Sequence, residues 1–125
     1  MRWVTFDCFG TLVDWLSGFS AILAPLFGER TAEVVRAYDR FERALETETP
    51  HRLYKDVLAA GLLRAAEHVG VPLTESQARR LPQQWGTMRV FEDAEPMLAG
   101  LRADGYRLGV LTNCDEDLFA ETQRA

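Results

Sequence analysis

One short stretch of the sequence combines residue types that could carry out nucleophilic chemistry. In VTFDCFGTLVDW, residues 4–15, an apolar run ends on Asp7, and Gly10 and Thr11 follow shortly after it. A carboxylate at the end of a strand could serve as a nucleophile or as a base. Phe9 stands two residues after Asp7, where an enzyme that works with a pair of acids would carry its second carboxylate. The chemistry open to Asp7 therefore depends on the role of Phe9.

A second apolar run ends in a hydroxyl and an amide. Residues 106–112 read YRLGVLT, so that Thr112 and Asn113 come at its carboxyl end. Ligands of open parallel sheets bind just outside the carboxyl ends of the strands. At such an edge, Asp7 would be flanked by two neutral hydrogen-bonding side chains. The structural alternative is that Asp7 makes a turn and that the Thr-Asn pair caps the following helix.

The elements expected to position these residues are two strands of a parallel sheet. Residues 2–8 predict a short buried strand that stops at Gly10, and residues 106–112 predict a second one. The segment DAEPMLAGLRAD, residues 93–104, predicts a helix that leads into the second strand, with Asp93 as its N-cap. A helix followed by a buried apolar strand is half of a βαβ unit, which favours an α/β fold.

The middle of the chain, residues 15–88, predicts about four helices. Apolar residues recur there at helical spacing, and the first helix is expected near residues 17–27. The expected helix boundaries are an N-cap and first position at Thr49 and Pro50, a C-terminal Gly70, and a capping box from Thr74 to Gln77.

Composition and charge exclude several classes of function. Of the 125 residues, 47% are apolar and 26% charged, as in a soluble globular protein. The formal net charge of −5 argues against nucleic acid or an anionic membrane as a partner. No run approaches the ~18 apolar residues of a membrane span, and the first residues do not resemble a signal peptide. Cys8 and Cys114 are the only cysteines, which predicts a reducing, cytoplasmic location.

The strings FDCFGTLVD and LGVLTN resemble the first two motifs of the haloacid dehalogenase superfamily, and the helical segment between them resembles its cap. The resemblance runs from residue 3 to the end of the chain and is greatest to the type II 2-haloacid dehalogenases. It implies an α/β fold with a Rossmann-like parallel-sheet core, of which the first two strands are present, and an inserted helical-bundle cap. Residues 1–14 and 89–125 would form the partial core, and residues 15–88 the cap. Asp7 would be the nucleophile.

Within this resemblance, Phe9 distinguishes two kinds of hydrolysis. Most members of the superfamily are phosphatases with an aspartate two residues after the nucleophile. An alkoxide that leaves a phosphate ester is a strong base and needs a proton from that acid, whereas a halide leaves unprotonated. The 2-haloacid dehalogenases carry an aromatic residue there, in a pattern matched by Asp7-Cys8-Phe9-Gly10-Thr11. Phe9 therefore favours carbon–halogen hydrolysis and would line a dry pocket for an alkyl halide.

The implied reaction is hydrolysis of a short 2-haloalkanoic acid through an aspartyl ester. Asp7 would attack C2 and expel halide, and water would hydrolyse the ester, so that the substrate carbon is inverted. Thr112 and Asn113 would hold the substrate carboxylate. Backbone N–H groups of residues 8–11, the expected substrate-binding loop, would assist them. The only partner implied is this small carboxylate, and no cofactor is implied unless a phosphatase reaction requires Mg²⁺.

The resemblance also implies a cap arginine that receives the leaving halide, in a stretch near residues 36–52. Arg40, Arg43 and Arg52 are the candidates. None of them aligns without a gap, and Arg43 is our first choice.

Four other residues are expected to be structural. Cys8 and Cys114 would act as small apolar filling, and His51 and His68 as surface or cap residues.

Two alternatives stay open. A superfamily phosphatase acting on a small phosphorylated metabolite would need a substitute acid, and Asp14, the only one nearby, is expected to cap the first cap helix. The other alternative, a non-catalytic or fragmentary member, gains weight because the superfamily's third and fourth motifs, a lysine and an acidic loop, would lie after residue 125. Two parallel strands cannot close a stable sheet, so this chain alone is not expected to be a competent enzyme. Exposed cap faces could support a homodimer.

Overall fold

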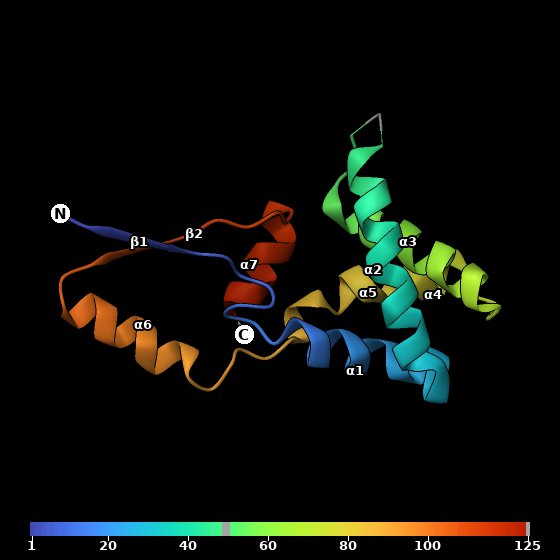
Figure 1. Cartoon of the computed structure of the whole chain (residues 1–125), viewed down its shortest axis with the longest axis horizontal. Helices are drawn as coiled ribbons and strands as arrows, with labels where there is room; N and C mark the ends of the chain where they lie inside the picture. Colours follow the sequence, from blue (N-terminus) through green and yellow to red (C-terminus); the bar gives the residue numbers. More distant parts are fainter. Residues whose placement is uncertain (49–50, 125) are drawn as a thin grey trace.

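The computed structural model describes residues 1–48 and 51–124. The two strands and α6 lie at one end of the molecule, the helices α1 to α5 gather at the other, and α7 lies between them (Figure 1). Within the described residues, no helix is both long and apolar enough to cross a membrane. The elements, with η marking 3-10 helices, follow in the order β1 (Trp3–Phe6), α1 (Trp15–Phe27), η1 (Gly28–Arg30), α2 (Thr31–Thr47), α3 (Tyr54–Val69), α4 (Glu75–Ala78), α5 (Arg80–Gln83), η2 (Trp85–Thr87), α6 (Ala94–Ala103), β2 (Arg107–Val110) and α7 (Glu116–Arg124).

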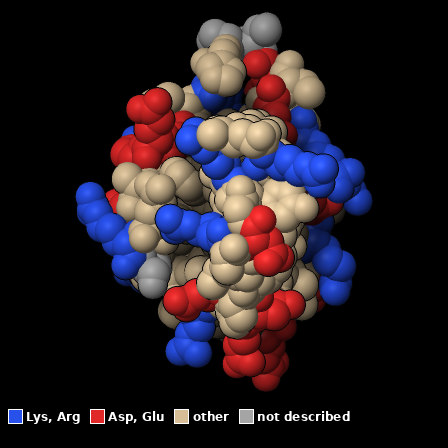
Figure 2. Space-filling view, turned by 90° about the vertical axis from the view of Figure 1, so that its left-hand side faces the viewer, with Lys and Arg blue, Asp and Glu red and all other residues tan. Residues whose placement is uncertain are grey.

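The described strands form a two-stranded parallel sheet, with Trp3 opposite Arg107 and Phe6 opposite Val110. α6 leads into β2, so the predicted α/β arrangement is confirmed. Both strands are shorter than predicted from the apolar runs. Figure 2 looks onto this end of the molecule and shows uncharged surface bordered by side chains of both charges. Trp3, Val110 and Leu111 are among the apolar side chains exposed to solvent.

The helices between the strands pack around one apolar core, and α2 and α3 approach closely where Gly61 faces Tyr38. A Cβ atom at Gly61 would lie 2.9 Å from the Tyr38 ring, so the small residue permits the close approach. Tyr38 is completely buried, as are other large members of this core, Phe19, Leu23, Leu58, Leu62, Leu81 and Trp85.

Several predicted helix boundaries are confirmed. Asp14 caps α1 by accepting a hydrogen bond from the Ser17 amide at 3.2 Å. Gly70 ends α3 in the left-handed conformation, with φ of 84°. The side chains and backbone amides of Thr74 and Gln77 form the predicted capping box at the start of α4.

Other boundaries differ from prediction. Residues 51–53 are not helical and α3 begins at Tyr54, whereas Thr49 and Pro50, the expected start, lie outside the described residues. The helix expected after Thr74 is divided into α4, α5 and η2. Pro82 explains the break between the first two, because it has no N–H to donate to the carbonyl four residues earlier. Asp93 precedes α6 as predicted, but within the described chain its side chain makes no capping hydrogen bond.

The chain passes between the sheet end and the helical end through two segments that lie side by side. The Asp14 amide donates to the Arg89 carbonyl at 2.8 Å, and the Phe91 amide donates to the Leu12 carbonyl at 2.9 Å. Val13 and Val90 form an antiparallel bridge between them. These contacts fall where we divide the chain into a partial core and a cap.

Candidate active site

The loop after β1 is folded tightly and leaves the Asp7 carboxylate at the surface. The Cys8 carbonyl accepts hydrogen bonds from the amides of Thr11, Leu12 and Val13, at 3.2, 2.8 and 3.0 Å. Gly10 takes a φ of 87°, which a residue without a side chain adopts at little cost. The Thr11 hydroxyl donates to Asp7 Oδ2 at 3.0 Å. The loop thus orients the carboxylate of Asp7 through one neutral donor.

The same loop has fewer amides to offer a ligand than predicted. Of the four residues 8–11 expected to bind the substrate carboxylate, Gly10 donates its amide to the Val13 carbonyl at 2.8 Å, and Thr11 donates to Cys8. The Thr11 hydroxyl is engaged with Asp7. In this conformation, a bound carboxylate would therefore depend more on side chains from other segments.

Phe9 belongs to a cluster of aromatic rings that joins the loop to the helices. Its half-buried ring meets Trp85 edge to face, with the centroids 5.1 Å apart. On another side, Trp85 contacts Tyr54 of α3 in the same manner at 5.7 Å. Aromatic rings favour this edge-to-face geometry. The position two residues after Asp7 is therefore an apolar packing position.

A pocket of about 310 Å³ opens beside the loop that follows β2. It brings Asn113, one of the predicted site residues, into the same cavity as Arg52. Among the residues that the structure describes, Asp7, Phe9 and Thr112 do not line this pocket. The lining comes from two sides, with Leu45, Glu46, His51, Arg52, Tyr54 and Val57 on one and Asn113, Cys114 and Asp115 on the other.

Of the three arginines considered for halide binding, the structure places Arg52 rather than Arg43 at the pocket. Arg43 is on an outer face of α2, where its side chain is 78% exposed and pairs with Asp39 at 3.1 Å. Arg40 lines a separate hollow beside His68. Arg52 lies in the non-helical segment before α3, and its guanidinium lies 3.5 Å from Glu48. Arg64 donates a hydrogen bond to the same carboxylate, which lowers the pKa of Glu48.

The two cysteines lie next to site residues but do not provide a thiolate. Burial, with a contribution from the charge of Asp7, raises the pKa of Cys8 to about 11. Burial and the charge of Asp115 raise the pKa of Cys114 to about 12. Both thiols are therefore protonated at neutral pH and weakly nucleophilic.

Within residues 1–48 and 51–124, no group of three or more His, Cys, Asp or Glu side chains is placed to hold a metal ion.

Sequence reasoning missed a half-buried acid that contacts Tyr54, one of the residues lining the pocket. The Tyr54 hydroxyl donates to Glu42 Oε1 at 2.6 Å, across the contact between α2 and α3. Burial raises the pKa of Glu42, and the hydrogen bond from Tyr54 opposes this effect. Tyr54 has the helical spacing of an apolar residue, so its ring was predictable. The partner of its hydroxyl depends on how two helices pack, which the spacing does not show.

Replacing Glu42 with glutamine is expected to stabilise the fold at neutral pH. The pKa of Glu42 is higher in the folded than in the unfolded protein, so stability falls as the pH rises from about 4.3, the ordinary glutamate value, through the raised value. Glutamine stays neutral, and its carbonyl can still accept from Tyr54. Urea unfolding of Glu42→Gln and wild type should differ more at pH 7 than at pH 4. The exposed Glu46→Gln is the control, and a pH-independent effect of Glu42→Gln would contradict this reading.

The fold has known relatives among solved structures. An L-2-haloacid dehalogenase from Xanthobacter autotrophicus superposes with a TM-score of 0.82 at 18% identity, covering 97% of this chain and 50% of that one. The L-2-haloacid dehalogenase PA0810 gives a TM-score of 0.75 at 27% identity, covering 99% of this chain and 57% of that one. Sequence comparison finds no matching family model and no matching curated protein. The chain thus has the fold of these enzymes over about half of their length.

Proposed function

We propose that the protein to which this chain belongs is a haloacid dehalogenase-like hydrolase that cleaves the carbon–halogen bond of short 2-haloalkanoic acids. The observation that carries this proposal is the pair Asp7 and Phe9. Asp7 presents a carboxylate at a strand end, and the position that an acid would occupy in a phosphatase holds a ring packed on Trp85. The pair occurs in a chain with the fold of the L-2-haloacid dehalogenases.

The proposed reaction proceeds in two steps through an ester of Asp7. A carboxylate oxygen attacks C2 opposite the halogen, so that a C–O bond forms while the carbon–halogen bond breaks and its electron pair leaves with the halide. Water then attacks the ester carbonyl, which restores the carboxylate and releases the 2-hydroxy acid and one proton. A structure of the Xanthobacter enzyme has chloropropionic acid covalently bound. That relative supports a covalent intermediate here by analogy.

Side chains near the end of β2 are assigned to the two negative charges of the reaction. Thr112 and Asn113 would bind the substrate carboxylate, since two of the loop amides are already engaged. Arg52 replaces Arg43 as our choice for the leaving halide, because it shares the pocket with Asn113. A guanidinium keeps its charge at any working pH and suits such an anion. The scheme uses no metal ion.

The phosphatase alternative lacks its substitute acid in this geometry. Asp14, the candidate, accepts a hydrogen bond from the Ser17 amide and caps α1. We assign this carboxylate to holding the helix, which weighs against a second role as the acid for a leaving group. We therefore retain a single proposed function.

A substrate panel with and without EDTA tests this function on the protein at its full natural length. We expect halide release from 2-chloropropionate that survives EDTA, and a lactate product inverted at C2. Alkyl phosphates should be turned over poorly, because a missing general acid costs about 10²–10⁴-fold in rate. Ion chromatography and chiral separation measure both outcomes. EDTA-sensitive phosphate release without halide release would overturn the assignment of Phe9, and inactivity on both classes would favour a non-catalytic protein.

A further inference from the structure

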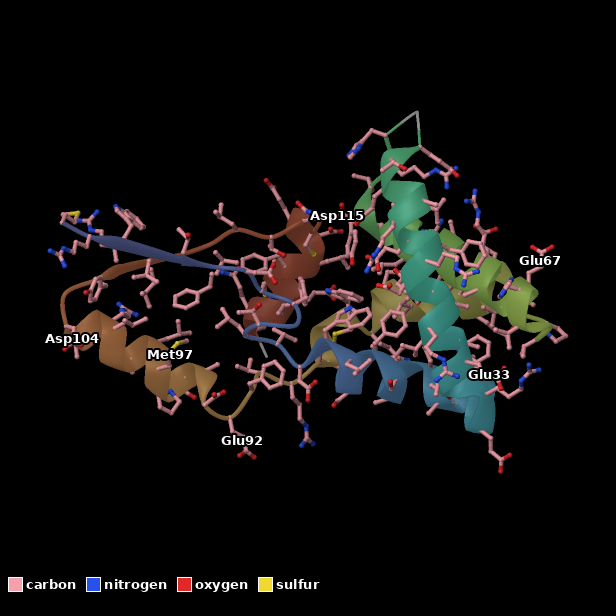
Figure 3. All side chains as sticks on the ribbon, viewed as in Figure 1. Glu33, Glu67, Glu92, Met97, Asp104 and Asp115 are labelled. Atoms are coloured by element: carbon pink, nitrogen blue, oxygen red, sulfur yellow. The ribbon has the colours of Figure 1, made fainter. Side chains whose placement is uncertain are left out.

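We propose that Asp115 is a positioning residue, which caps helix α3 from the opposite side of the pocket and so holds Arg52 and Tyr54 against Asn113. Asp115 follows Asn113 and Cys114 in the loop after β2. Its side chain lies at the top of α7, toward the helices of the cap (Figure 3). This inference rests on the proposed function in assigning a role to Arg52.

The hydrogen bonds of Asp115 define the capping. Its Oδ1 accepts from the Tyr54 amide at 2.8 Å and its Oδ2 accepts from the Lys55 amide, also at 2.8 Å. Both bonds are partly buried, and they use both oxygens of the carboxylate. These amides belong to the first turn of α3, whose N–H groups have no partner within the helix.

The helix needs this external partner because of the residue that precedes it. Leu53 occupies the N-cap position, where Ser, Thr, Asp or Asn would normally accept a hydrogen bond from the first turn. A leucine side chain has no acceptor. Asp115 supplies the acceptor from a distant part of the chain, and its negative charge also suits the positive end of the helix dipole.

The position of this cap links it to the pocket. Arg52 and Tyr54 flank Leu53, and both line the cavity together with Asn113 and Asp115. Fixing the Tyr54 amide to Asp115 therefore fixes the segment that carries Arg52 relative to the end of β2. Because small displacements of a charged group lower a reaction rate strongly, the capping bonds should matter to turnover.

A second contact across the same boundary provides a control. Lys55 forms an ion pair with Asp117, the residue after next along the chain from Asp115. That pair is made by exposed side chains and does not engage the backbone of α3. Exposed ion pairs of this kind stabilise little.

The experiment compares Asp115→Ala, Asp115→Asn and Asp117→Asn in the protein at its full natural length. Amide exchange followed by NMR should be about tenfold faster at Tyr54 and Lys55 in Asp115→Ala, the effect of losing a helix cap. Asp115→Asn should lie between that variant and wild type, because its amide retains one oxygen acceptor. Asp117→Asn should stay within about twofold of wild type, as expected for an exposed pair.

Kinetics on 2-chloropropionate complete the test. We expect kcat/KM to fall about tenfold or more in Asp115→Ala and to recover in part in Asp115→Asn. A purely structural role would lower Tm and leave the kcat/KM of the folded protein unchanged, which would overturn the proposal. Unchanged exchange at Tyr54 and Lys55 would overturn it as well. If Asp115→Ala does not fold, Asp115→Asn tests the proposal instead. Amide exchange faster than wild type together with a lower kcat/KM would support it, and wild-type values of either would overturn it. If the wild type releases no halide, the proposed function fails, and the exchange rates still decide whether Asp115 caps α3.

Discussion

Replacing Asp7 with asparagine is expected to lower halide release by about four to six orders of magnitude, the loss that accompanies removal of a group on which covalent catalysis depends. An amide is a poor nucleophile toward carbon, while its shape preserves the hydrogen bond from Thr11. The loop should therefore keep its fold, and the loss can be assigned to chemistry. Steady-state chloride release measures the effect.

Mass spectrometry gives an independent readout of the same prediction. A single turnover in ¹⁸O-labelled water should place the label in the peptide that contains Asp7, since water attacks the ester carbonyl. Asp14→Asn is the matched control, because it changes the same side chain at the cap of α1. It should leave turnover by the folded protein near the wild-type rate. Retention of a tenth of the wild-type rate in Asp7→Asn would remove Asp7 from the role of nucleophile.

Replacing Arg52 with alanine should cost about a hundredfold or more in rate. Removing one group that stabilises developing negative charge typically costs ~2.7–4 kcal/mol. Arg43→Ala should have an effect of less than about twofold, because its exposed pair with Asp39 lies on an outer face of α2. Chloride release at saturating substrate distinguishes these variants. The difference between them follows from the position of each arginine relative to Asn113.

Arg64→Ala controls for the loss of an ion pair in the Arg52 variant. Arg52 and Arg64 both contact Glu48, but among the described residues only Arg52 of these two lines the pocket. Arg64→Ala should change stability more than turnover. A large effect of Arg43→Ala would restore that residue as the halide ligand. Near-wild-type rates in both Arg52→Ala and Arg43→Ala would place the halide site elsewhere or exclude dehalogenation.

Local signals in the sequence predicted much of the fold. The capping box at Thr74, the glycine at the end of α3 and the capping role of Asp14 were all readable, because each depends on residues within one turn. The start of α3 was not readable. Its acceptor, Asp115, is supplied from the far end of the chain, and no spacing rule connects that residue with Leu53.

The positions of Asp7 and Asn113 after the strands were predictable, whereas the position of the arginines relative to the pocket was not. Asp7 and Asn113 follow apolar runs, and the parallel pairing of the strands was expected. Arg43 was preferred over Arg52 from its place in the chain alone. Choosing between them requires knowing which surface of the helices faces the end of β2. That surface is set by packing around Gly61 and Trp85, which periodicity within one helix does not reveal.

The bridge between Val13 and Val90 has a consequence for how such a protein could be altered. The helical segment enters and leaves at one place, so its two ends are neighbours in space although far apart along the chain. Segments with adjacent ends are the ones that natural and engineered proteins gain, lose or exchange most readily, because a short turn can join the flanking backbone. The loop at Asp7 and the pocket wall at Arg52 could therefore diversify as separate units, one under the demands of the proposed reaction and the other under those of its substrate.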